Sequence, residues 1–489
     1  NGPAGSSKAQ PLDALILTPT GFKPMGRLSV GDFVYSQNGK PTKILGIFPQ
    51  GDKDVFRIDF SDGVSTECTE DHLWFTQTNK DRNYQIKCNG KKFKQPKSGS
   101  IKTTKDIQGS IFARKTTHLN HSIPICSSID FKCKRHYISP YVLGVLLGDG
   151  CIKYNINFSS GDEDIVNFLR KELPEDITLT YKSNYDYSIF NKDRSLARKN
   201  GGNFIKLELI RLGLFGLGSS KKFIPDEYLI DSVDNRISLL RGLMDTDGHC
   251  IGASSYFSTI SPFLRDGVRF LVESLGGTVR INEYIPSYSY KGKKLIGKIC
   301  FKLCICLPSN INPFRLERKK IRVIPKSKYV PIRYIVNITR VGTKPCQCIL
   351  VEDESHLYLT NNFIVTHNTL LSVYSSLKLL NEKRISDIVY LRSAVESSDR
   401  ALGYLPGTVD DKLHFYNLPF IDKLEELLNK NDINKLQRDN RVSMFPVNFC
   451  RGMNWNAKCI ILDEAQNSTI KEIITVLTRL GRFSKCFVL

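Results

Sequence analysis

The chain has 489 residues and is strongly basic, with 70 Lys and Arg side chains against 49 Asp and Glu. This length predicts about three domains, and the charge favours nucleic acid as a partner over a membrane. No stretch approaches the roughly 20 apolar residues of a membrane span, and no charged start leads into an apolar run. Scattered cysteines in such a chain favour reduced thiols, so we expect a cytoplasmic protein with no membrane partner.

Three patterns follow one another outside the middle of the chain. Residues 9–76 show period-two alternation broken by TPTG, NGK and SDG, which predicts a compact all-β unit. Residues 80–105 are rich in Lys, Arg, Gly and Ser and predict an exposed basic loop. Strand character returns at 321–368, and the residues from 369 onward predict helices around one buried strand, CIILDEAQ.

The middle, at about 136–320, alternates helices with strands and contains an internal repeat. PYVLGVLLGDGCI at 140–152 matches SLLRGLMDTDGHC at 238–250. NFSS and YFST follow at corresponding places, each before a helical stretch. Two copies of one unit predict pseudo-twofold symmetry in this part of the chain.

The first eight residues begin a phosphate-binding loop that the chain does not complete. Such a loop needs Ser or Thr directly after its lysine to ligate magnesium, but Ala9 follows Lys8. Joining Lys8 to Thr369 restores the pattern as GPAGSSK-TLLSVYSSLKLL, so residues 9–368 read as an insert. The loop residues expected to cradle the phosphates are Gly2, Gly5, Ser6, Ser7 and Lys8.

The ends of the insert carry residues suited to its removal. Asn368 precedes a hydroxyl residue and follows His367, which is the arrangement needed for asparagine cyclisation assisted by an imidazole. Upstream, Thr69 and His72 form a TxxH pattern that could supply a proton donor at the first junction. Both signals flank an insert that breaks a phosphate loop, and together they predict that the insert removes itself.

These segments resemble an intein, with LTPTGFKPMGRLSVGD, the TEDH block and the closing LYLTNNFIVTHN-T as the matching pieces. The resemblance implies an all-β horseshoe of the Hint type, built from 9–125 and 325–368, and splicing without a cofactor. Inteins usually begin with Cys or Ser. Ala9 and the set Trp74, Cys348 and Thr366 resemble the class that lacks this first nucleophile.

The chemistry of the residues agrees with that class. A thiolate is a strong nucleophile, so Cys348 can attack the Lys8 carbonyl, with His72 and Thr69 as donors to the oxyanion. Transfer to Thr369, cyclisation of Asn368 and an O-to-N shift would then join the flanks. An alternative origin of Ala9, replacement of a nucleophilic Cys or Ser, would leave an arrested ordinary intein.

The repeat contains a second candidate site. Gly144 and Gly148 in one copy, and Gly242 and Thr246 in the other, lie four apart on a helical face and allow two helices to approach closely. Each helix then ends in an acid followed by glycine. Two adjacent carboxylates, Asp149 and Asp247, favour divalent metals and phosphodiester hydrolysis.

This pair resembles the LAGLIDADG motif of homing endonucleases, and the resemblance covers about 136–320. The resemblance implies cleavage of double-stranded DNA with Mg²⁺ on Asp149 and Asp247, and strands that lie along the major groove. Lys222, with Lys221 as a less certain neighbour, matches the accessory lysine that stabilises the transition state or tunes the attacking water. The open alternative is a degenerate nuclease that survives only as a fold.

Residues 1–8 and 369–489 resemble PhoH-like P-loop ATPases, through GPAGSSKT, YLRSAVESSDRALGYLPG and IILDEAQ. The resemblance implies ATP and Mg²⁺ as cofactors, and nucleic acid such as RNA as a partner. Thr369 and Asp463 would hold magnesium, and Glu464 would position the attacking water. Ser7 departs from the usual glycine, and the end at CFVL leads us to expect a truncated host.

The sequence therefore predicts a multidomain precursor with an all-β Hint domain, a duplicated α+β LAGLIDADG domain and a fragment of an α/β P-loop NTPase. A virus or phage is a possible source of such a gene. The competing interpretation is a P-loop ATPase with a permanent, non-splicing DNA-binding insertion. The expected segments are 1–8 for the upstream host, 9–125 and 325–368 for the Hint domain, 126–324 for the nuclease, and 369–489 for the downstream host.

Overall fold

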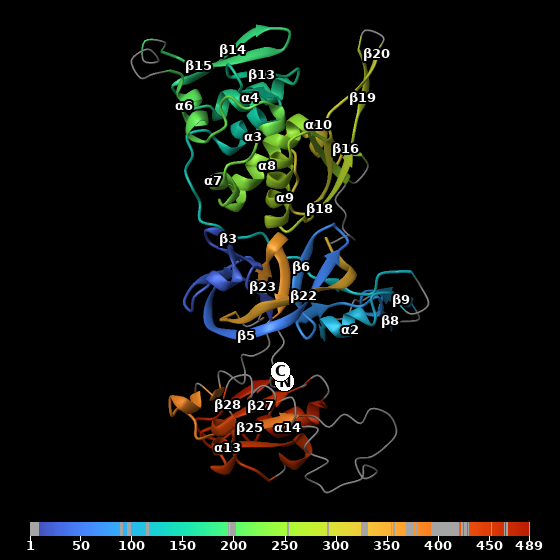
Figure 1. Cartoon of the computed structure of the whole chain (residues 1–489), viewed down its shortest axis with the longest axis vertical. Coiled ribbons are helices and arrows are strands. Elements are labelled where there is room, and N and C mark those ends of the chain that lie inside the picture. Colours follow the sequence, from blue (N-terminus) through green and yellow to red (C-terminus); the bar gives the residue numbers. More distant parts are fainter. Residues whose placement is uncertain are drawn as a thin grey trace. The chain divides into compact units, whose positions relative to one another are not determined.

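The computed structural model divides the chain into two compact units, Gln10–His367 and a second unit of 1–9 with 368–489 (Figure 1). None of its described helices is long and apolar enough to cross a membrane. The described residues are 9–488 without 89–90, 95–98, 114–116, 194, 196–201, 252–253, 291–292, 324–330, 354, 356, 368–375, 378, 393–419, 422–423, 425–427, 429, 451, 464 and 466–467.

The first and last segments of the larger unit form one all-β body, as predicted. Two long antiparallel strands, β5 and β22, form its frame in a sheet of order β1-β22-β5-β4, and a second sheet has the order β24-β23-β2-β3. Opening strands of the insert thus pair with its closing ones. The strands are β1 (Gln10–Pro11), β2 (Leu15–Thr18), β3 (Gly21–Pro24), β4 (Phe33–Tyr35), β5 (Pro41–Phe60), β6 (Ser65–Thr69), β7 (Leu73–Thr76), β11 (Ser122–Ile123), β22 (Arg333–Val351), β23 (Leu357–Thr360) and β24 (Ile364–His367).

The basic stretch at 80–105 is not a loop, so that prediction was wrong. Thr78 with Asp81, and Thr103 with Asp106, form capping boxes that start short helices in a segment without apolar periodicity. Strand β10 pairs with β7 and thereby joins the all-β body. The elements are α1 (Asn79–Arg82), β8 (Gln85–Cys88), β9 (Lys91–Lys94), β10 (Ser100–Thr103) and α2 (Thr104–Gln108).

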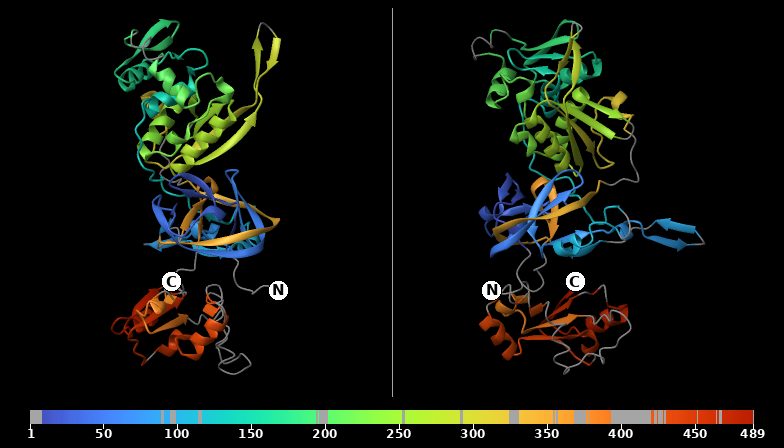
Figure 2. Two further views of the ribbon diagram at one scale, coloured as in Figure 1. Left: turned by 60° about the vertical axis from the view of Figure 1, so that its left-hand side comes forward. Right: turned by 45° about the vertical axis from the view of Figure 1, so that its right-hand side comes forward.

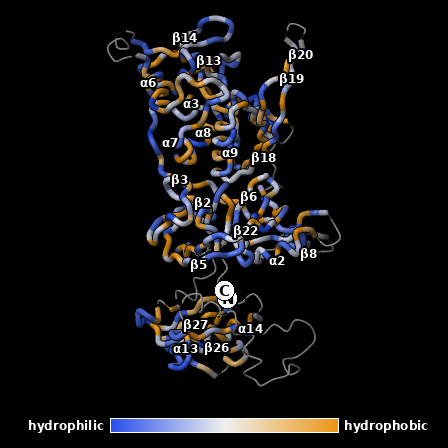
Figure 3. Tube along the Cα trace, viewed as in Figure 1, coloured by the Kyte–Doolittle hydropathy of each residue, from blue (hydrophilic) through white to orange (hydrophobic). Residues whose placement is uncertain are grey.

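The repeat folds as two copies of one α+β unit. Their sheets have matching orders, β12-β13-β15-β14 and β16-β17-β21-β18, and one apolar core spans both copies (Figure 3). The first copy contains α3 (Pro140–Gly148), β12 (Gly150–Cys151), β13 (Asn157–Ser159), α4 (Glu163–Glu172), β14 (Ile177–Ser183), β15 (Asp186–Asn191) and α6 (Phe204–Arg211). The second contains α7 (Asp226–Leu229), α8 (Val233–Asp247), β16 (Gly248–Ile251), β17 (Ser254–Thr259), α9 (Pro262–Ser274), β18 (Thr278–Tyr284), β21 (Cys300–Cys306) and α10 (Glu317–Lys320).

One hairpin distinguishes the second copy from the first. Strands β19 (Ser287–Tyr290) and β20 (Lys293–Ile296) continue β18 and β21 beyond their sheet, as the yellow hairpin in Figure 2 shows. The first copy turns instead at Asn184 and Tyr185, directly between β14 and β15.

The smaller unit contains a parallel sheet, as a P-loop fold requires. Its order is β26-β25-β27-β28, and the predicted buried strand is β27, whose residues from Cys459 to Leu462 are fully buried. The elements are β25 (Asp387–Arg392), α13 (Lys430–Arg438), β26 (Val442–Pro446), β27 (Lys458–Asp463), α14 (Ile470–Leu477) and β28 (Lys485–Val488).

Candidate active sites

The structure brings together His72 and Thr366, which lie 294 residues apart in the sequence. Thr69 ends β6, and its carbonyl accepts a hydrogen bond from the His72 backbone N–H at 3.2 Å. This turn directs the fully buried His72 ring toward β24, where Nε2 hydrogen-bonds with the hydroxyl of Thr366. The upstream TxxH block and the strand before the downstream junction therefore share one site.

Trp74 is fully buried and holds the backbone around His72. Its Nε1 donates to the Thr104 hydroxyl at 3.0 Å, and that hydroxyl lies 3.3 Å from the His72 carbonyl oxygen. The two rings also meet edge to face, with centroids 5.3 Å apart. Thr104 belongs to the basic stretch and was missed by the sequence analysis.

Tyr358, also missed, lies between the two ends of the insert. Its buried hydroxyl donates to Gln10 Oε1 at 2.8 Å, while its backbone pairs with Thr366 across the β23–β24 hairpin. Burial raises the Tyr358 pKa well above its ordinary value, and neighbouring Cys348 adds to the shift. Tyr358 therefore contacts the residue after Ala9 through its side chain and pairs with the strand that leads to Asn368 through its backbone.

Cys348 is the more accessible thiol of its CxC pair. Both cysteines lie on β22, where Gln10 of β1 pairs with Gln347 and brings the start of the insert next to Cys348. Cys346 is buried, which raises its pKa to about 11, and fully buried Cys68 has a pKa of about 12. Cys348 is only half-buried, so of the two thiols it is the one that a substrate carbonyl can more readily reach.

The atoms of the two junctions are only partly described. Ala9 is fully buried, and the His367 backbone pairs with Leu357 at the end of β24. Lys8, Asn368 and Thr369 lie outside the described residues, as does the rest of the phosphate loop (Gly2, Gly5, Ser6 and Ser7).

In the repeat, α3 and α8 approach as closely as their glycines suggest. A Cβ added to Gly144 would lie 2.4 Å from the Leu239 carbonyl oxygen, and one on Gly242 would lie 2.4 Å from that of Tyr141. Only glycine permits these contacts. The helices therefore end side by side, with Asp149 and Asp247 at their carboxyl ends.

Burial raises the pKa of both carboxylates. Partial desolvation raises the pKa of Asp247 to about 6, and the negative charge of Asp149 adds to the shift. The pKa of Asp149 is also raised by desolvation, while Lys222 and Lys319 act against both shifts. A cleft of about 470 Å³ reaches Asp149.

Lys222 and Lys319 occupy equivalent positions in the two copies. Lys222 Nζ donates to the carbonyl oxygens of Leu146, Leu147, Gly148 and Gly150 at 2.7–3.1 Å. Lys319 Nζ does the same for Met244, Asp245, Thr246 and Gly248 at 2.6–3.4 Å. Burial lowers the Lys222 pKa to about 8, whereas Lys221 is exposed. Lys319 was missed, although KKIRVIP repeats the Lys-Lys and Ile-Pro of KKFIP.

A divalent cation fits the chemistry of this pair. Two adjacent carboxylates whose pKa values are raised by desolvation gain from a neutralising cation. Within the described ranges, no group of three or more His, Cys, Asp and Glu side chains forms a metal site. Asp149 and Asp247 would thus supply the protein ligands, and phosphate and water oxygens the remainder.

In the smaller unit, Asp463 ends β27 at the carboxyl edge of the parallel sheet, where such folds bind ligands. The Tyr390 hydroxyl, from neighbouring β25, donates to its carboxylate. Glu464 lies outside the described residues.

Comparison with known proteins separates the insert from its flanks. A family model described as PhoH-like protein matches residues 365–489. The PhoH-like protein of Mycobacterium bovis is 37% identical over 123 residues, which cover 25% of this chain and 35% of that protein. The replicative DNA helicase DnaB of Mycobacterium intracellulare is 27% identical over 380 residues, which cover 76% of this chain and 60% of the helicase. A match of that length must lie largely within 9–368, since the flanks are too short to contain it.

Several solved structures are similar to parts of the chain. The MchDnaB-1 intein is 12% identical and covers 74% of this chain and 100% of its own, with a TM-score of 0.24. Mesophilic variants of the homing endonuclease I-DmoI are 20% identical and cover 36% and 92%, with a TM-score of 0.21. Residues 365–489 are therefore similar to PhoH-like proteins, and the residues before them carry the sequence patterns that resemble an intein with a LAGLIDADG domain.

The structure brings His72 and Thr366 together from the two halves of the all-β body, and it places Asp149 and Asp247 at the ends of adjacent helices from the two repeats. Thr104 and Tyr358 lie beside His72 and Thr366 but belong to no sequence motif. Their contacts join segments that are far apart in the chain, so the sequence alone does not reveal them. The chain spans 60% of the helicase and 35% of the PhoH-like relative.

Proposed function

We propose that the chain is a precursor that excises residues 9–368 and joins Lys8 to Thr369. The observation that best supports this proposal is that the two ends of the intein meet at Tyr358, whose hydroxyl bonds to Gln10 and whose backbone pairs with Thr366. A permanent insertion has no need to pair Gln10 beside Cys348 or to bond Thr366 to the buried imidazole of His72. The non-splicing alternative is therefore not favoured.

In the upstream step, the Cys348 thiolate attacks the Lys8 carbonyl carbon. A thioester forms, the Lys8–Ala9 bond breaks, and the Ala9 nitrogen takes a proton. His72 is held for this proton transfer by Thr366, and through its backbone by Thr104 and Trp74. Because Ala9 takes no part as a nucleophile, the reaction requires a reachable thiol elsewhere, and Cys348 meets that requirement.

In the downstream steps, the Thr369 hydroxyl takes the acyl group from Cys348 and releases the thiol. The Asn368 side-chain nitrogen then attacks its own backbone carbonyl, breaking the bond to Thr369 and forming a succinimide, while His367 protonates the leaving amine. The ester between Lys8 and Thr369 finally rearranges to an amide. Thr366, fixed by His72, orients the strand that carries these residues.

A matched pair of variants tests this assignment. Cys348→Ala should abolish the excised fragment, whereas Cys346→Ala, two residues away in the same strand, should retain it. Equal splicing by both variants would remove Cys348 from the mechanism.

We also propose that the LAGLIDADG domain cleaves double-stranded DNA with Mg²⁺. When bound, the cation supplies charge stabilisation and an activated water. Asp149 and Asp247 hold it, and Lys222 and Lys319 keep the helix ends that carry them in place. Asp247→Asn should abolish cleavage of a duplex carrying the uninterrupted gene and leave splicing intact. Unchanged cleavage by this variant would contradict the assignment.

For the spliced host we propose ATP hydrolysis with Mg²⁺, through Lys8, Thr369, Asp463 and Glu464, in a protein that acts on RNA. Splicing would activate it, because Lys8 and Thr369 form one phosphate loop only after joining. ATP hydrolysis that persists in the Cys348→Ala precursor would refute this. We also propose a cytoplasmic location, because none of the described cysteines forms a disulfide.

A further inference from the structure

The hairpin that carries Thr366 has a strained tip. Residues Asn361–Phe363 join β23 to β24, and both Asn362 and Phe363 have a φ of +53°. A bulky phenylalanine in this region is costly, on the order of 1–3 kcal/mol, and persists only where its surroundings hold it. The contacts that hold the tip therefore affect the position of β24, which begins directly after it.

Polar contacts to the tip come from a helix of the LAGLIDADG domain. Glu273, near the end of α9, accepts a hydrogen bond from Asn362 Nδ2 at 3.4 Å. Arg333 donates to the Asn362 carbonyl oxygen at 3.1 Å and pairs with Glu273 at 3.5 Å and with Asp62 at 2.7 Å. Side chains of Glu273, Arg333 and Asp62 are no more than 4% exposed.

Aromatic contacts come from the same helix. Phe270 lies one turn before Glu273 on α9, and its ring meets the Phe363 ring edge to face at 5.1 Å. Phe22 of β3 completes the cluster, 5.4 Å from Phe363 and 6.2 Å from Phe270. The two faces of the strained tip are thus held by α9 and by the Hint fold together.

The tip sets the position of the splicing residues. Strand β24 begins at Ile364, directly after Phe363, and Thr366 follows two residues later. Thr366 must meet the buried His72, and Asn368 lies two residues beyond it. Three residues of strand span about 10 Å, so a shift at the tip is transmitted along β24 to the downstream junction.

We infer that Glu273 and Phe270 are positioning residues for splicing, supplied to the intein's Hint fold by its nuclease domain. They act through Asn362 and Phe363, and they contact none of the reacting atoms. The nuclease domain is then a structural part of the splicing centre, independently of whether it cleaves DNA. This inference rests on the proposed splicing function.

Charged groups face Glu273, so its effect on splicing should also depend on pH. Burial raises the Glu273 pKa to about 7, against the opposing effects of Arg333 and Arg269, while Asp62 raises it further. Protonation changes how strongly Glu273 holds Arg333 and Asn362. The efficiency of the downstream step should therefore change near pH 7 in the parent, and this component should be absent from Glu273→Gln.

The test uses the full chain and intact-mass analysis of all products over time. Variants are Glu273→Gln, Glu273→Ala and Phe270→Leu, with Asp266→Asn as the control, because Asp266 lies on the exposed face of the same helix. Asp247→Asn should remove DNA cleavage and keep the domain folded, so it tests whether splicing depends on the activity of the nuclease domain or on its structure. Both the rate of splicing and the ratio of spliced product to single-junction cleavage are measured across pH 6–8.

We expect Glu273→Ala and Phe270→Leu to lower that ratio about 10-fold or more, since misplacement by about 1 Å costs up to about 100-fold in a reaction. Glu273→Gln should retain more of the ratio because its amide still reaches Asn362. Asp266→Asn and Asp247→Asn should match the parent. A uniform fall in all products, or variants equal to Asp266→Asn, would overturn the inference. A parent that never splices would instead contradict the proposed function.

Discussion

Replacing Tyr358 by Phe removes one buried hydroxyl and leaves the packing of the ring unchanged. The lost contact is the 2.8 Å hydrogen bond to Gln10 Oε1, and both side chains are buried, at 3% and 0% exposure. Leaving a buried amide oxygen without its donor costs about 1–3 kcal/mol. If the lost free energy no longer holds the upstream junction in its reactive position, the first step slows by about 5-fold to 150-fold, because 1.4 kcal/mol corresponds to a factor of ten.

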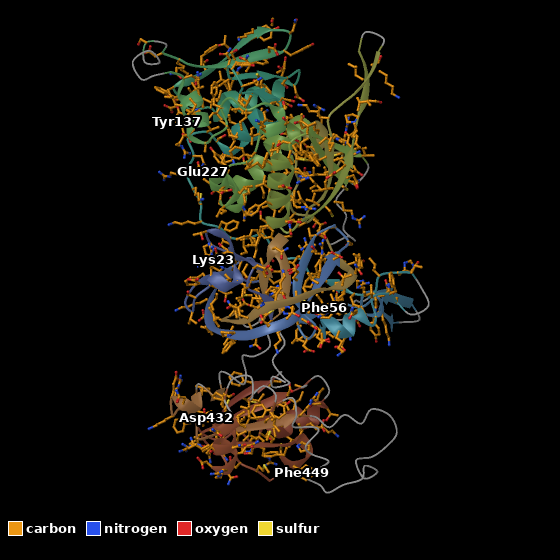
Figure 4. The ribbon with its side chains drawn as sticks, viewed as in Figure 1. Lys23, Phe56, Tyr137, Glu227, Asp432 and Phe449 are labelled. Carbon is orange, nitrogen blue, oxygen red and sulfur yellow. The ribbon has the colours of Figure 1, made fainter. Side chains whose placement is uncertain are left out.

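The downstream step should be affected much less. Tyr358 pairs with Thr366 through its backbone, which Phe preserves, so Asn368 keeps its position. The variant should therefore shift products from splicing toward downstream cleavage alone, as measured by intact mass over time. Tyr137→Phe is the matched control, because its hydroxyl bonds to Asp176 on the exposed surface of the nuclease domain (Figure 4).

A second variant separates positioning from simple loss of stability. Tyr358→Phe combined with Gln10→Leu removes both partners of this hydrogen bond, and with them the longer bonds from Gln10 Nε2 to the Glu67 carbonyl and the Thr360 hydroxyl at 3.4 and 3.5 Å, so it restores part of the stability but not the hydrogen bond. We expect thermal stability to recover in part and the product ratio to stay shifted. Equal slowing of the two junctions, or a product ratio that returns with stability, would refute the reasoning.

Three further predictions concern the nuclease domain. Gly144→Ala would place a Cβ 2.4 Å from the Leu239 carbonyl oxygen and should destabilise the domain by at least about 1–3 kcal/mol in thermal melts, whereas Gly218→Ala, with open space, should not. The pKa of Asp247 is about 6 in the folded chain, above its ordinary 3.8, so its protonation stabilises the fold fully below about pH 4 and this stabilisation is lost as the pH rises through 6. Thermal melts in EDTA should show this fall in stability in the parent and not in Asp247→Asn. Lys319→Met leaves four carbonyl oxygens without their donor, so it should lower the free energy of unfolding by about 2 kcal/mol or more and abolish DNA cleavage. Lys320→Met changes an exposed neighbour and should lower the free energy of unfolding by less than about 0.5 kcal/mol.

The sequence was informative where function depends on residues in a fixed local order. The glycine spacing of the repeat predicted the α3–α8 contact, because helix periodicity alone places Gly144 and Gly148 on one face. The interrupted phosphate loop predicted the insert in the same way. In both cases each half of the signal is a short local motif, and the two halves can be matched by sequence alone.

Residues whose roles depend on distant partners were not predictable. Tyr358 and Gln10 lie 348 positions apart, and Thr104 acts through Trp74, so no spacing marks either contact. The basic stretch was misread because its helices start from capping boxes and its strands are too short to show a period. Lys319 was recoverable in principle, had the repeat been extended to both lysine pairs.

The most direct test of the account is intact-mass analysis of the purified parent chain, followed by sequencing of the product across the junction. The account predicts a free 9–368 fragment and a second product in which Lys8 is bonded to Thr369. A chain that stays whole across temperature, pH and reductant, with Cys348 reduced, would contradict self-excision and leave the phosphate loop interrupted.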